Sequence, residues 1–158
     1  RELMQKLQEY LTYSSSEKQT NIAEVLHTIA NQIHRRSLIV IFSDFFEQNY
    51  QLDKLLDAIK HLKHHKHEVI VFNTVHRPSE VAFEYGNQPV TFIDAETDEQ
   101  IKVSPHEVRE AYIKRINNYE QVLKSSFTQY KIDYVEADTS KRIEHALIPF
   151  LVKRKKMI

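Results

Sequence analysis

The sequence predicts an α/β fold with three layers and a mainly parallel sheet. Two apolar runs, at 37–43 and 69–72, are rich in β-branched side chains, as buried strands are. Between them, large aliphatic residues recur at helical spacing, at Leu52, Leu55, Leu56, Ile59 and Leu62. A strand, a helix and a strand in this order form a β-α-β unit, so we expect two parallel strands joined by a right-handed crossover.

Two helices are predicted before this unit and a long helix after it. Apolar residues at helical spacing predict one helix over 3–11 and a second over 20–33, both before the first strand. A long helix is expected to begin at Pro105, because Ser104 and Glu107 have the spacing of a capping box and proline suits the first helical position.

A small β-hairpin is predicted as an insertion at 78–103. Short strands at 90–93 and 100–103 flank an acidic turn. After the long helix, a third strand over 132–135 and a final helix bent at Pro149 complete the alternation of strands and helices. We therefore expect one α/β domain over residues 1–158.

The strand at 37–43 is apolar at every position, which predicts a central strand buried on both faces. A central strand needs a neighbour on each side, yet no strand is predicted upstream of it. Either an upstream strand is missing from this chain, or the hairpin or a second copy covers the edge. We expect the strand at 37–43 to be covered, either by a second copy of the chain, through self-association, or by a rearranged N-terminal segment.

Composition excludes several classes of function. The chain has 22 basic and 22 acidic residues, so no net field favours nucleic acid or an anionic membrane as a partner. It has no cysteine, which excludes thiol chemistry and fits a cytoplasmic location. Its one glycine, Gly86, is too few for a glycine-rich phosphate loop, and no apolar run approaches the roughly 20 residues of a membrane span.

Asp44 is the first candidate for chemistry, because it directly follows the strand at 37–43. In parallel α/β sheets, ligands bind outside the carboxyl ends of the strands. The competing interpretation is that Asp44 only turns the chain or caps the next helix.

Two motifs carry a resemblance to a known family. Thr20 and Asn21 at the start of a helix, followed by the run 35–44, resemble the second and third metal-site motifs of a von Willebrand factor type A domain. The whole chain is similar to the C-terminal part of the domain-of-unknown-function fifty-eight family. The segments that carry this similarity are 64–72, 90–97, 110–112, 132–134 and 138–139.

The resemblance implies a partial type A, Rossmann-like fold and a site for Mg²⁺, with Thr20 and Asp44 as two of its ligands. The Asp-x-Ser-x-Ser motif of type A domains is absent, so the site is incomplete and only weak Mg²⁺ binding is expected. Phe45 stands where glycine often follows the aspartate. The chain is expected to be the C-terminal part of a larger type A-like domain.

The resemblance also implies a function. It predicts a non-enzymatic protein-interaction module that acts as an adaptor for a MoxR-type AAA ATPase. No catalytic triad, His-Glu-x-x-His motif or carboxylate pair with a nucleophile is present, so no enzymatic activity is indicated. The alternative is a metal-dependent hydrolase that uses Asp44 with Asp94, Glu96 or Asp98 of the acidic hairpin. The simpler interpretation of these hairpin acids is a solvated turn.

Histidines and lysines alternate at the end of the helix before the second strand. His61 and His65 have the i, i+4 spacing of metal ligands, and His64 and His67 lie close by in sequence. Lys60, Lys63 and Lys66 would repel a metal ion, so the favoured interpretation is a cationic helix C-terminus that complements the helix dipole. The basic residues at 153–156 are interpreted in the same way.

Overall fold

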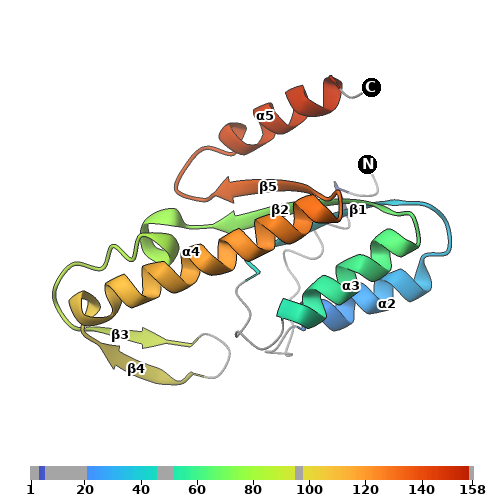
Figure 1. The fold of residues 1–158 in the computed structure, drawn as a ribbon. Coiled ribbons are helices and arrows are strands. Elements are labelled where there is room, and N and C mark those ends of the chain that lie inside the picture. Colours follow the sequence, from blue (N-terminus) through green and yellow to red (C-terminus); the bar gives the residue numbers. More distant parts are fainter. Residues whose placement is uncertain (1–3, 6–20, 46–51, 95–97, 157–158) are drawn as a thin grey trace.

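The structure is a computed structural model that describes residues 4–5, 21–45, 52–94 and 98–156 (Figure 1). The helix predicted over 3–11 lies almost entirely outside the described residues. Within them, the chain forms one parallel sheet flanked by helices and a separate two-stranded hairpin. No described helix is both long and apolar enough to cross a bilayer.

The main sheet has three strands, β1 (Leu38–Ser43), β2 (Glu68–Val75) and β5 (Asp133–Asp138), in the order β1-β2-β5. Both pairings are parallel. Helix α3 (Leu52–His64) joins β1 to β2, which confirms the β-α-β unit. Parallel pairing brings the carboxyl ends of all three strands to one edge of the sheet.

Helices lie on both faces of this sheet, as a three-layer fold requires. Helices α2 (Ile22–Gln32), α3 and α4 (Pro105–Gln129) cover one face, and α5 (Glu144–Lys155) lies on the other (Figure 1). The core between the first three helices and the sheet is aliphatic and aromatic, with Leu26, Ile41, Leu55, Val71, Leu123 and Phe127 among its buried residues. On the opposite face, the Phe150 ring of α5 packs edge-on against Phe72 of β2.

The predicted start of α4 is confirmed, but the predicted capping box is not. The helix begins at Pro105, whose fixed φ suits the first helical turn. The side chain of Ser104 makes no capping hydrogen bond; the Glu107 backbone N–H instead donates to the Ser104 carbonyl. At α2, in contrast, the Asn21 side chain accepts a hydrogen bond from the Glu24 N–H and caps the helix.

The hairpin insertion is confirmed. Strands β3 (Val90–Ile93) and β4 (Gln100–Val103) pair antiparallel and form a sheet of their own. A short π-helical turn, η1 (Arg77–Val81), leads from β2 toward the hairpin. Since the hairpin does not pair with β1, the proposal that it covers the β1 edge is wrong.

The prediction that β1 is central and buried on both faces is also wrong for the described residues. The central strand is β2, whose residues 69–73 are all buried. Strand β1 lies at the edge, and its burial alternates: Leu38, Val40 and Phe42 are 54%, 43% and 68% exposed. The physical reason is that α5 packs over β5 and β2, so the outer face of β1 has no described helix above it.

Candidate functional site

The carboxyl ends of the three parallel strands form the edge where the sequence places its candidate residue. Ser43 of β1 is in register with Asn73 of β2, which is in register with Glu136 of β5. As predicted, Asp44 directly follows β1, and the structure shows it exposed. We name this region, from Asp44 across to Asp138 at the end of β5, the carboxyl edge.

Only one of the two Mg²⁺ ligands that the resemblance implies lies among the described residues. Asp44 lies at the carboxyl edge, whereas Thr20 lies outside the described residues. Among the described residues, no three histidine, aspartate or glutamate side chains gather into a group that could hold a metal ion. The described side chains therefore do not by themselves fit Mg²⁺, and the pairing of Thr20 with Asp44 stays a prediction.

Phe45 fixes the backbone immediately after Asp44. Its φ of 51° lies in the left-handed region that favours glycine, and its side chain is only 1% exposed. The ring packs edge-on against Phe127 of α4, at 5.8 Å between centroids. The Tyr119 hydroxyl donates to the Phe45 carbonyl over 2.5 Å. Phe45 thus keeps the conformation of a glycine while anchoring the chain to α4.

A network of ion pairs covers the β5 side of the carboxyl edge. Arg77 donates two hydrogen bonds to the Glu136 carboxylate, at 2.5 and 2.8 Å. The Lys124 ammonium lies 3.1 Å from both Glu136 and Glu120. The hydrogen bonds from Arg77 lower the pKa of Glu136 despite its partial burial, and those to Glu136 raise the pKa of Arg77. This network joins β5 to α4 and to the start of η1.

Asp138 organises the loop after β5. Its carboxylate accepts hydrogen bonds from the Ser140 hydroxyl at 2.7 Å and from the backbone N–H groups of Ser140 and Arg77. Lys141 lies 3.3 Å away. These donors, led by the Ser140 hydroxyl, lower the pKa of Asp138 to about 2. The next residue, Thr139, donates its N–H to the last carbonyl of β2. Asp138 and Thr139, which form one of the segments that carry the family similarity, therefore both have a structural role here.

Asn73 is the polar residue that the sequence analysis missed. It is 5% exposed and lies toward the carboxyl end of β2, after the apolar run 69–72 and before Val75. Its amide donates to the Tyr134 hydroxyl over 2.9 Å, while its side-chain oxygen has no hydrogen-bond partner among the described groups. A polar residue within an apolar run is the signal that could have identified it, since buried amides require partners.

The acidic hairpin has the features of the solvated turn. Asp94 and Asp98 are exposed, and the Asp98 N–H donates to the Asp94 carbonyl. Glu96 lies outside the described residues. The metal-dependent hydrolase would need these acids and Asp44 around one ion, and no described metal-binding group contains them.

The histidine cluster is only partly what the sequence predicted. His64 and His65 are exposed near the end of α3. His67 is instead 2% exposed, and its Nδ1 accepts a hydrogen bond from the Ser37 N–H. His61 faces a residue that the sequence analysis did not consider, because its Nδ1 lies 3.3 Å from Nδ1 of His27 on α2. Sequence spacing could not identify this pair, since the two residues are 34 positions apart.

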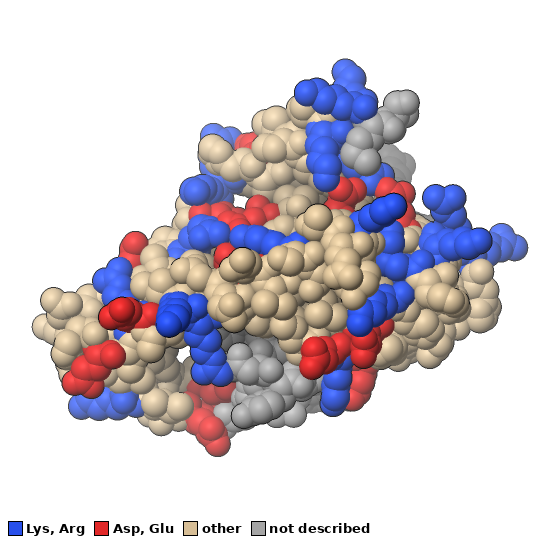
Figure 2. Space-filling model, in the orientation of Figure 1, with Lys and Arg blue, Asp and Glu red and all other residues tan. Residues whose placement is uncertain are grey.

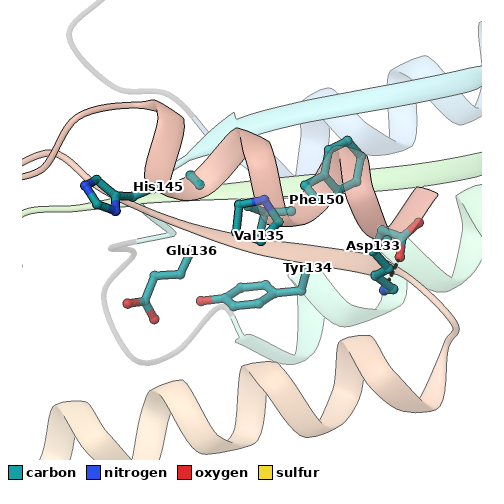
Figure 3. Close-up of a pocket in the computed structure, with 9 residues that line it drawn as sticks. Asp133, Tyr134, Val135, Glu136, His145 and Phe150 are labelled. Carbon is teal, nitrogen blue, oxygen red and sulfur yellow. Dashed lines mark hydrogen bonds and ion pairs between the residues drawn. The ribbon is translucent and has the colours of Figure 1, made fainter. Parts of the chain in front are cut away.

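A groove between β5 and α5 is lined by charged and apolar side chains (Figure 3). The Lys153 ammonium reaches across it to Asp133, at 2.7 Å. Val135 points toward α5, whereas Tyr134 and Glu136 point to the other side of the sheet. Figure 2 shows acidic and basic side chains gathered along this side of the molecule, between α5 and α4. The outer edge of β5 is therefore charged.

The described residues form an α/β domain with a three-stranded parallel sheet and a separate two-stranded hairpin. The family model described as "Protein of unknown function DUF58" matches residues 1–122, so the chain belongs to the DUF58 family. Neither the curated proteins nor the solved structures contain a significant match. The family match ends within α4; β5, which is the third strand of the main sheet, and helix α5 lie beyond it.

Proposed function

We propose that this domain is a non-enzymatic protein-interaction module and that β1 is the strand through which it engages its partner. The observation that carries the proposal is the exposed apolar row of Leu38, Val40 and Phe42 on a strand without a described second neighbour. Apolar side chains beside an open strand edge favour pairing with another chain.

The backbone of β1 also favours this mode of binding. The Glu68 N–H donates to the Ser37 carbonyl, and hydrogen bonds of a parallel ladder alternate along the strand. The amides of Leu38, Val40 and Phe42 therefore face away from β2, toward the open edge. A partner strand would gain main-chain hydrogen bonds from these amides and apolar contacts from the adjacent face.

The family resemblance supplies a class of partner, the MoxR-type AAA ATPase, for which the domain would act as an adaptor. A Mg²⁺ ion held by Thr20, Asp44 and ligands from a complete type A-like domain would lie at the carboxyl end of the same strand. An open coordination position on such an ion can accept a carboxylate of the partner. Asp44 supports this combination because it directly follows β1.

Binding of the domain to a purified MoxR-type AAA ATPase from the same genome tests the proposal. Val40→Pro removes one outward amide and Val40→Lys places a charge on the apolar row; each should weaken binding at least about tenfold, or roughly 1.4 kcal/mol. Ile93→Lys is the matched control, because Ile93 is a 60% exposed apolar residue on the hairpin. Binding that survives both Val40 substitutions unchanged would refute β1 as the contact strand.

Titration calorimetry with Mg²⁺ tests the metal site separately. The chain should bind Mg²⁺ weakly, because it offers too few hard oxygen ligands, and Asp44→Ala should abolish that binding. Tight binding that is unaffected by Asp44→Ala would mean that the ligands are other residues.

A further inference from the structure

We propose that the apolar surface between β1 and α5 binds an amphipathic helix of a protein partner, and that this helix carries acidic residues at one end. We name this surface the β1–α5 shelf; it comprises Leu38, Val40 and Phe42 of β1 with Leu147 and Leu151 of α5. The proposal rests on the proposed function, because both concern β1, and it adds the structure and the charge of the bound segment.

The apolar row of β1 lies on the same side of the sheet as α5. Ile39 and Ile41 belong to the core that α2, α3 and α4 cover, so the residues that alternate with them face the opposite side. The Phe42 ring stacks on Phe72 of β2, at 4.9 Å between centroids, and Phe72 in turn packs against Phe150 of α5. An aromatic row therefore runs from α5 to β1.

One flank of α5 is directed toward β1. His145 and Pro149 line the groove beside β5 and therefore mark the other flank (Figure 3). Leu147 and Leu151 lie on the opposite flank, because each is two residues, or about 200° of helical rotation, from one of these groove residues. Arg154 follows Leu151 on this flank, and its ion pair with β2 agrees with the assigned direction. Leu151 is 58% exposed, so the flank offers an apolar contact.

The outer face of β1 has room for one helix beside α5. Helix α5 packs mainly over β5, and β1 is the second strand from β5 in the sheet. Neighbouring strands lie about 4.8 Å apart, so a helix centred over β1 would lie about 9.6 Å from α5. Packed helices are separated by about 8–10 Å, so such a helix can contact β1 and α5 together. Among the described residues, no helix takes this position.

The C-terminal end of α5 lies at the amino ends of the strands. Arg154, near the end of α5, pairs with Glu68 and Asp133, which are the first residues of β2 and β5. Helix α5 therefore runs antiparallel to the strands, and the residue that begins β1, Leu38, lies at the same end because it is in register with Glu68.

Basic residues gather at this end of the shelf, and an acidic residue lies at the other. Arg35 and Arg36 are exposed shortly before β1, and Lys155 and Lys156 are exposed at the end of α5. Figure 2 shows basic side chains at the C-terminal end of α5. Asp44 is exposed just after the carboxyl end of β1. The two ends of the shelf thus carry charges of opposite sign.

These charges favour one direction and one composition of the bound helix. The C-terminus of a helix carries a partial negative charge and the N-terminus a partial positive charge. A helix parallel to α5 therefore places its C-terminus at the basic end and its N-terminus near Asp44. Acidic side chains in its last turns complement Arg36 and Lys155. Helix α5 of a second copy, bound in this direction, would place its own Lys155 and Lys156 against like charges, so an acidic partner fits better.

Fluorescence anisotropy with synthetic helical peptides tests the shelf. Each labelled peptide has about 15 residues, the length at which an isolated helix begins to be stable. The acidic peptide has leucines at i, i+3, i+4 and i+7 and glutamates in its last turns; a second peptide has lysines in place of these glutamates, and a third has the acidic peptide's residues in scrambled order. We expect saturable binding of the acidic peptide, at least about tenfold weaker binding of the lysine peptide and no binding of the scrambled one.

Two neighbouring positions on α5 provide a matched pair of variants. Leu151→Gln should weaken binding of the acidic peptide at least about tenfold, because an apolar contact of the shelf is lost. Val152→Gln should bind as the wild type does, since Val152 is also exposed but is directed about 100° further round the helix, away from β1. Lys155→Glu combined with Lys156→Glu should reduce the preference for the acidic peptide over the lysine peptide. Thermal unfolding checks that each variant folds.

No saturable binding of the acidic peptide, equal binding of the lysine peptide, or an equal loss in Val152→Gln would each overturn the proposal. Self-association that Leu151→Gln abolishes and the acidic peptide does not compete with would assign the shelf to a second copy, and would also overturn it.

The outcome can be separated from that of the ATPase experiment. ATPase binding that is lost in Val40→Pro but retained in Leu151→Gln would keep β1 as the contact strand and overturn the helix-binding shelf. Binding of the acidic peptide that Leu151→Gln abolishes, in a chain that does not bind the ATPase, would support the shelf and refute the ATPase as the partner.

Discussion

The two edges of the main sheet are built in opposite ways. Strand β5 carries Asp133, Glu136 and Asp138, each engaged in an ion pair. Strand β1 presents an exposed row of one leucine, one valine and one phenylalanine, at 38, 40 and 42. Natural sheets protect their edges with charges, because an unprotected edge pairs with other chains. The β5 edge is thus suited to water, whereas the β1 edge has the composition of a strand that is covered.

The ion pairs of β5 show how one edge is protected. Arg154 contacts both Asp133 and Glu68, and therefore joins α5 to the starts of β5 and β2. At the other end of the strand, Arg77 and Lys124 hold Glu136. Strand β1 carries no charged side chain, and the contact on its outer face is apolar: the Phe42 ring stacks on Phe72 of β2, at 4.9 Å between centroids.

The largest effect is expected at Phe45, where the β1 chain leaves the sheet. Phe45→Ala should destabilise the fold by about 3–5 kcal/mol, because a fully buried ring is lost. Phe45→Gly should be less damaging by about 1 kcal/mol, since glycine relieves the strain of φ 51°. Urea unfolding measures both variants. A glycine variant less stable than the alanine variant would contradict the proposed strain.

The two edges should differ in their response to substitution. Glu136→Gln should cost about 1–3 kcal/mol, because Arg77 and Lys124 lose the carboxylate between them. Phe42→Ala should cost less than about 1 kcal/mol in the isolated chain, since Phe42 is 68% exposed. Denaturant unfolding at low protein concentration gives both values. Similar losses at the two positions would remove the distinction between the edges.

A smaller effect is expected from Asp138 in acid. Its folded-state pKa of about 2 is below the usual 3.8, so ionised Asp138 stabilises the fold fully above pH 3.8. That contribution is lost as the pH falls from 3.8 toward 2. Asp138→Asn should therefore flatten the decline in stability over this interval, and thermal unfolding at a series of pH values can detect the change. An unchanged slope would show that other carboxylates determine the acid response.

Much of the fold could be predicted from the sequence because periodicity and turn residues are local signals. The β-α-β unit, the hairpin and the start of α4 at Pro105 all follow from such signals. The edge position of β1 does not follow from such signals. An apolar run indicates that both faces of a strand suit burial, but it does not show whether the described chain covers both of them.

The candidate sites were harder to predict for a related reason. Asp44 could be placed at the carboxyl edge because it follows a strand. The contact between His27 and His61, and the network between Arg77 and Glu136, join residues 34 and 59 positions apart. Such contacts depend on how the helices pack, and a single sequence gives no direct signal for them.

The central claim is that the open edge of β1 pairs with other chains, a second copy of this chain included, and sedimentation velocity over a wide concentration range tests it most directly. The wild-type chain should self-associate as its concentration rises, since a second copy can pair with the open edge. Val40→Pro and Val40→Lys should stay monomeric, while Ile93→Lys should associate as the wild type does. Circular dichroism checks that each variant is folded. A wild-type chain that remains monomeric at the highest concentration, or Val40 variants that associate equally well, would contradict the claim.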